Sequence, residues 1–72
     1  MSAAREILAN NMRSYRAMRG WSQEALALEA GLHRTFIGHV EAGNRNISLD
    51  NLERIAIAFG ITLSQLLVDA EQ

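Results

Sequence analysis

The placement of glycine is the feature that most constrains the fold of this chain. Gly20, Gly31, Gly43 and Gly60 divide a 72-residue sequence that contains no proline and no cysteine. Between them apolar residues recur at spacings of three and four, and no stretch alternates strictly between apolar and polar. Because glycine commonly ends helices, the sequence predicts an all-α fold of five short helices. The length indicates a single domain over residues 1–72.

Cap residues set the expected helix bounds. Ser22 and Ser48 stand where N-caps are expected, and Thr62 with Gln65 has the pattern of a capping box. The predicted helices are Ala3–Arg19, Gln23–Ala30, Arg34–Ala42, Leu49–Phe59 and Leu63–Val68. The expected core faces of the first four helices are Leu8, Met12 and Tyr15; Leu26, Ala27 and Ala30; Ile37 and Val40; and Leu49, Leu52, Ile55, Ala56 and Phe59. The fifth helix carries the apolar residues Leu63, Leu66, Leu67 and Val68.

Composition limits the classes of function. The formal net charge is -1, whereas many DNA-binding domains are strongly basic. Whether this chain can bind DNA therefore depends on how its charges are distributed over the surface. We expect no signal peptide, no membrane span and a cytoplasmic location, because no long apolar run follows the first residues. His33 and His39 lie on different faces of one helix, and no glycine-rich loop follows a strand. We therefore expect no metal, no cofactor and no enzymatic activity.

The second and third predicted helices are separated by only a few residues, centred on Gly31. Two short helices joined so tightly must cross steeply, and small residues such as Ala27 and Ala30 allow their backbones to approach. This is the helix-turn-helix arrangement, whose second helix lies in the major groove of DNA. The sequence therefore predicts a DNA-binding domain in which the third helix reads the base pairs.

An ordered set of residues extends from the second helix to the fifth: Trp21–Ala27, Ala30–Leu32, Ile37, Val40–Glu41, Gly43, Ser48–Leu49, Leu52, Ile55–Ala56, Phe59–Ile61, Leu63 and Leu66–Leu67. The chain resembles the Xre family, which contains phage repressors, Cro proteins and many small bacterial regulators. The segment Leu32–Ile37, with Arg45 and Asn46, is most similar to the controller proteins of restriction–modification systems. The resemblance implies a compact, phage-repressor-like DNA-binding domain and a homodimeric transcriptional regulator that controls its own operon.

Four residues form the outward face of the third predicted helix: Arg34, Thr35, Gly38 and His39. Arg34 can bond both acceptors of guanine, Thr35 can touch a thymine methyl group, and His39 can bond a base edge. A glycine in mid-helix costs about 1 kcal/mol relative to alanine. We expect Gly38 to permit either close approach to DNA or helix packing. The alternative for this face is an ordinary solvated surface.

Phosphate contacts are expected around the reading helix. The resemblance implies that Gln23 contacts a phosphate and packs on the third helix. It also implies that Arg16 pairs with Glu41, joining the first helix to the third, while Arg16 can reach a phosphate as well. The other expected phosphate contacts are His33, Asn44, Arg45 and Asn46. Phe36 is expected in the core or beside the DNA backbone. Arg13 and Arg19 on the first helix are weaker candidates for phosphate contacts, the alternative being that both are solvated.

The late part of the chain is rich in apolar residues, which indicates a partner. We expect a homodimer formed through Ile61, Leu63, Leu66 and Leu67, the alternative being that all four are core. Such a dimer would bind a palindromic operator on double-stranded DNA. Contact with RNA polymerase stays open, with Glu24 and Glu29 as candidates. The alternative functions are an antitoxin or phage-type repressor that also binds a protein partner, and a helical bundle without DNA binding.

Overall fold

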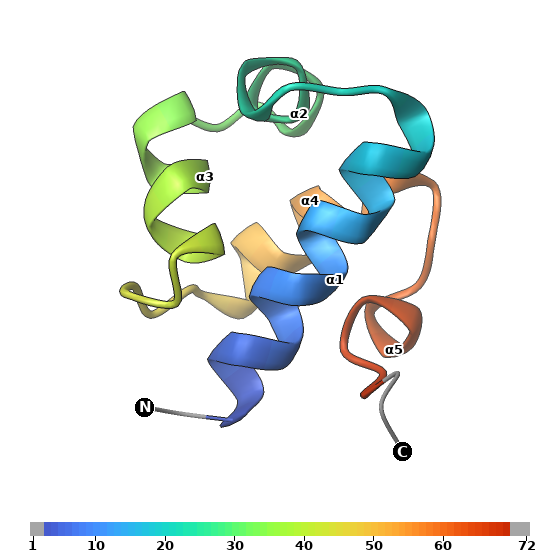
Figure 1. Cartoon of the computed structure of the whole chain (residues 1–72). Coiled ribbons are helices and arrows are strands. Elements are labelled where there is room, and N and C mark those ends of the chain that lie inside the picture. Colours follow the sequence, from blue (N-terminus) through green and yellow to red (C-terminus); the bar gives the residue numbers. More distant parts are fainter. Residues whose placement is uncertain (1–2, 70–72) are drawn as a thin grey trace.

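The computed structural model describes residues 3–69, and within this range it contains five α-helices and no strand (Figure 1). The helices are α1 (Ala3–Arg19), α2 (Gln23–Ala30), α3 (Arg34–Glu41), α4 (Leu49–Phe59) and α5 (Leu63–Leu66). In Figure 1, α3 and α5 lie on opposite sides of α1. Helix α3 packs on α1 and α2, whereas α5 packs on α1 and α4. The all-α prediction is therefore confirmed, and none of the described helices is long and apolar enough to span a bilayer.

The caps predicted from the sequence are present. The Ser22 and Ser48 hydroxyl oxygens accept hydrogen bonds from the backbone N–H groups three residues later, at 3.0 and 3.1 Å. Thr62 and Gln65 form both hydrogen bonds of the capping box. Gly31 has φ 70° and ends α2, and the chain then enters α3 after only two further residues. This left-handed conformation, which favours glycine, is what makes the tight turn of the helix-turn-helix possible.

Two helices end earlier than predicted. Helix α3 ends at Glu41 and not at Ala42, which is the C-cap and is followed by the left-handed Gly43. Helix α5 ends at Leu66 and not at Val68. The Asn11 amide nitrogen of α1 donates to the backbone oxygens of Leu66 and Val68, each at 2.7 Å. The C-terminal segment is therefore held against α1 by a side chain, and it leaves the helical path.

The core is one continuous cluster to which all five helices contribute. Its buried members are Leu8, Met12, Leu26, Ala27, Ala30, Ile37, Val40, Ile55, Ala56, Phe59 and Leu66. The prediction of Leu49 as core is wrong: it is the first residue of α4 and is 69% exposed. Leu67 and Val68 are also exposed, because they follow the end of α5.

The prediction of Leu66 as a dimer-interface residue is wrong. Its side chain is completely buried within a single chain, so it is not available to a partner. Ile61 and Leu63 are half-buried and pack against the core cluster, whereas Leu67 is exposed. The apolar periodicity of the sequence did not distinguish Leu66, which is buried in the core, from Leu67, which is exposed.

Candidate nucleic-acid interface

Helix α3 has one buried and one exposed side. Ile37 and Val40 are buried in the core, whereas Arg34, Thr35 and His39 are exposed. The core therefore fixes the helix from behind and leaves three of the predicted base-reading residues facing outward. All three side chains carry hydrogen-bond donors, which is what contact with base edges requires.

Gly38 lies toward α2. A Cβ atom at this position would come within 3.5 Å of the Gln23 side-chain oxygen, which is an ordinary van der Waals distance. The glycine is half-exposed, and the side chain it would face belongs to α2. A Cβ atom would therefore fit beside α2 without a clash, so helix packing does not by itself require a glycine at this position.

The predicted pair of Arg16 and Glu41 is present and forms a two-pronged ion pair. The Nε–H and Nη2–H groups of Arg16 donate to the two carboxylate oxygens of Glu41, at 2.7 and 2.8 Å. The Arg16 Nη1–H group donates to the Trp21 carbonyl oxygen at 2.9 Å. The Glu41 side chain is only 3% exposed and that of Arg16 is 18% exposed. The hydrogen bond to Glu41 raises the pKa of Arg16 above its ordinary value, although burial opposes this shift.

Glu41 also binds the second helix. The Gln23 amide nitrogen donates to Glu41 Oε1 at 3.2 Å. One carboxylate at the end of α3 therefore receives side chains from both α1 and α2. Gln23 is thereby held at the junction of the three helices, and it is only half-exposed.

Arg13 and Arg19, the weaker candidates for phosphate contacts, are exposed, as expected of solvated arginines, and each also bonds within the fold. Arg13 donates to the Glu41 backbone oxygen at the end of α3. Arg19 donates to the Phe59 backbone oxygen at the end of α4. The Arg19 guanidinium also lies over the rings of Tyr15, Trp21 and Phe59, at 5.2–5.9 Å from their centroids. No local sequence signal marks the hydrogen bonds to Glu41 and Phe59, because these acceptors lie 28 and 40 residues further along the chain.

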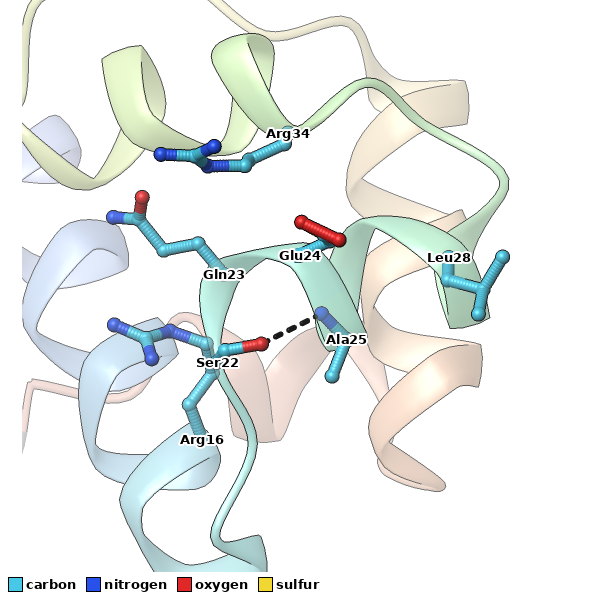
Figure 2. A pocket seen from close by; sticks show the side chains of 7 residues that line it. All are labelled: Arg16, Ser22, Gln23, Glu24, Ala25, Leu28 and Arg34. Atoms are coloured by element: carbon cyan, nitrogen blue, oxygen red, sulfur yellow. Dashed lines mark hydrogen bonds between the residues drawn. The ribbon is translucent and has the colours of Figure 1, made fainter.

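An open hollow of about 690 Å³ lies between the start of α2 and the start of α3. Figure 2 shows the Arg34 side chain reaching from α3 toward the Gln23 amide, with Arg16 on the opposite side of Gln23. The N-terminus of α2 opens on the same hollow, and helix N-termini attract phosphate. Since the charge of Arg16 is balanced by Glu41, and Glu24 adds a negative charge, the cation free for an anion here is Arg34.

A second hollow, of about 530 Å³, lies on the other side of the reading face. It is lined by Leu32, His33, Thr35, Phe36, His39, Arg45 and Asn51. The Arg45 guanidinium lies 5.3 Å from the centroid of the Phe36 ring. Phe36 packs against the core cluster, and its ring also contacts the Arg45 guanidinium. The structure thus brings His33 and Arg45 beside Thr35 and His39.

The remaining loop residues are less closely tied to the reading face. Asn44 and Asn46 are exposed in the segment between α3 and α4. The Asn44 backbone N–H group donates to the His39 carbonyl oxygen at 3.1 Å, and the Asn46 side-chain oxygen accepts from Arg5 of α1. Across residues 3–69 no group of three or more histidine, aspartate and glutamate side chains is arranged to hold a metal ion.

The comparisons with known proteins agree with this geometry. The chain belongs to the helix-turn-helix family HTH_3, whose model matches residues 12–66. The matched segment contains all of α2, α3 and α4 and therefore includes both hollows. No catalytic family is indicated by the match.

Three similar proteins are regulators by name. The chain is 46% identical over 68 residues to a hypothetical transcription factor of Neisseria meningitidis serogroup B, covering 94% of this chain and 64% of that protein. It is 49% identical over 63 residues to the control protein C.SmaI of Serratia marcescens, covering 88% of this chain and 75% of that protein. The crystal structure of the restriction–modification controller protein C.AhdI from Aeromonas hydrophila superposes with a TM-score of 0.85 at 38% identity, covering 90% and 98% of the two chains.

Replacement of Glu41 by alanine should strongly destabilise the protein. The change leaves the largely buried Arg16 guanidinium without its counter-ion, and loss of one partner of a buried pair costs about 3–5 kcal/mol. We expect a loss near the lower limit, because Arg16 keeps some contact with water. Urea unfolding followed by Trp21 fluorescence, at one fixed protein concentration, measures the change in the free energy of unfolding.

Glu53→Ala is the matched control, since Glu53 is an exposed carboxylate on α4. It should change the free energy of unfolding by less than about 0.5 kcal/mol. The variant Arg16→Met, alone and combined with Glu41→Ala, completes a double-mutant cycle. Equal effects of Glu41→Ala and Glu53→Ala would show that the buried pair does not stabilise the helix junction.

Proposed function

We propose that this protein is a sequence-specific DNA-binding transcriptional regulator, a controller protein that acts as a homodimer on its own operon. The observation that carries the proposal is the exposed polar face of α3, formed by Arg34, Thr35 and His39 and backed by the core. The names of the control proteins to which the chain is similar support the link to a restriction–modification operon. This proposal places the protein in the cytoplasm, together with the DNA that it would regulate.

Direct base contacts are assigned to Arg34, Thr35 and His39. The phosphate contacts are assigned to Gln23, His33, Asn44, Arg45 and Asn46, all of which surround α3 in the structure or follow it in the chain. Gly38 stays a fourth candidate for a base contact, because it is half-exposed on the same helix. Arg16 stays a candidate for a phosphate contact, because three of its five N–H groups donate within the protein and the side chain, 18% exposed, lines the hollow beside Gln23. Its ion pair with Glu41 would at the same time orient the reading helix.

Substitution of Arg34 by alanine should weaken operator binding by about 1–3 kcal/mol and relax the preference for the correct sequence. Fluorescence anisotropy measures this change when the protein is titrated into labelled duplex DNA from immediately upstream of its gene. Scrambled duplex serves as competitor, and two salt concentrations report the phosphate contribution.

Arg54→Ala removes the same charge from an exposed position on α4 that lines neither hollow. It should leave the preference for operator over scrambled DNA unchanged. If the wild-type protein binds both duplexes equally, and Arg34→Ala makes no difference, the protein is not a reader of this DNA. Purification with a second protein would then favour the antitoxin alternative.

The homodimer is proposed to form through α4 and α5, which pack against each other. The support is their exposed apolar surface: Ile57 is 70% exposed, Leu67 and Val68 are exposed, and Ile61 and Leu63 are half-buried. Where exposed apolar residues adjoin, they mark interaction sites. A two-fold symmetric dimer would present two α3 helices to successive major grooves, about 34 Å apart, on a palindromic operator.

The change Ile57→Asp should convert the dimer into a folded monomer, because it places a charge at the proposed interface but not in the core. Sedimentation equilibrium measures the mass, and circular dichroism reports the retained helix content. Met18→Asp introduces the same charge at an exposed apolar position on α1 and should leave the dimer intact. A dimer that persists with Ile57→Asp would place the interface elsewhere.

Contact with RNA polymerase is a further proposal, supported by the exposed surface of α2. Glu24, Leu28 and Glu29 are exposed there, and Leu28 is 81% exposed. Glu29 does not line the hollow beside Arg34. In transcription with purified polymerase, Glu29→Lys should reduce activation while operator affinity stays unchanged. Full activation by this variant would argue against a contact through Glu29.

A further inference from the structure

The contact between Phe36 and Arg45 joins the reading helix to the loop that follows it. The guanidinium carbon of Arg45 lies 5.3 Å from the centroid of the Phe36 ring. This is within the distance at which a cation is attracted to the face of an aromatic ring. Arg45 makes no ion pair or hydrogen bond to any other described residue. The ring is thus the contact that restricts this long side chain.

The ring itself is held by the core. Phe36 is half-buried and packs against the central cluster, on a helix whose neighbouring residue Ile37 is completely buried. A flexible arginine on a loop loses conformational freedom when it binds, and this loss reduces affinity. A guanidinium resting on a fixed ring has already lost part of that freedom, and its N–H groups remain available along its edge.

The position of the pair relates it to DNA. Phe36 and Arg45 line the same hollow as Thr35 and His39, two of the proposed base-reading residues. Arg34 lines the other hollow, on the α2 side of the reading face. Arg34, on α3, and Arg45, in the loop that follows it, therefore line different hollows beside the reading face.

We propose that Phe36 is a positioning residue for DNA recognition, whose ring holds the Arg45 guanidinium in place beside α3. Phe36 then determines affinity through Arg45 and does not contact a base itself. This inference rests on the proposed function, since it requires that the reading face of α3 binds DNA. Leucine at position 36 would fill apolar space without offering a ring face, whereas tyrosine would keep the ring.

A double-mutant cycle in operator binding tests this role. Phe36→Leu should weaken binding about two- to fivefold, which corresponds to an exposed cation–π contact. Arg45→Ala should weaken it further and reduce the salt dependence by about one phosphate contact. In the Arg45→Ala background, Phe36→Leu should change affinity less than twofold, and Phe36→Tyr should keep the wild-type effect of Arg45. Urea unfolding of every variant separates these effects from loss of folded protein.

A second measurement examines the stack without DNA. In the free protein, the ring should shift the NMR resonances of the Arg45 side chain upfield, and Phe36→Leu should abolish this shift while Phe36→Tyr retains it. Phe36→Leu that weakens binding equally with and without Arg45 would overturn the proposal, as would the absence of a ring-dependent shift. Failure of the proposed function has a different signature, because the wild-type protein would then not prefer operator DNA even with the stack present.

Discussion

The buried carboxylate of Glu41 is the interaction on which the orientation of the reading helix depends. It lies at the end of α3 and receives donors from Arg16 of α1 and Gln23 of α2. Removing a carboxylate from water is costly, and only well-placed charged and neutral donors offset that cost. In the described part of the chain every buried side-chain nitrogen and oxygen has a hydrogen-bond partner. A rotation of α3 would break several of these bonds at once, so the junction favours one arrangement of the three helices.

The same ion pair changes how charge is distributed over the candidate interface. Arg16 lines the hollow at the start of α2, but its charge is balanced by Glu41. Among the residues that the structure describes, the arginines of the candidate interface that have no counter-ion are Arg34 in one hollow and Arg45 in the other. A net charge of -1 is therefore compatible with DNA binding, because the charges of this interface are local. Each protomer has few of them, and pairing of two protomers would double their number on one operator.

The bounds of α1, α2 and α4 could be predicted from the sequence, because caps and glycine are local signals. The early end of α5 could not, because the apolar pattern continues past Leu66 and the hydrogen bonds that hold the following segment come from Asn11, more than 50 residues away. The pair of Arg16 and Glu41 was available only from family resemblance, since no spacing rule connects the two positions. The contacts of Arg13 and Arg19 had no such guide. Adjacent leucines show the limit of periodicity: Leu66 is buried and Leu67 is exposed, although both follow the same apolar pattern.

Because each interface has few cations, the affinity for DNA depends on how little conformational freedom the protein loses when it binds. The junction at Glu41 restrains α3 before DNA arrives, and the core behind Ile37 and Val40 restrains it from the other side. The Phe36 ring extends this restraint to a loop arginine that the helix alone could not position. Preorganisation of this kind reduces the entropy lost on association and does not depend on salt. If the proposed base contacts are correct, operator preference should persist at salt concentrations that remove non-specific attraction, because base contacts and not phosphate contacts distinguish one sequence from another.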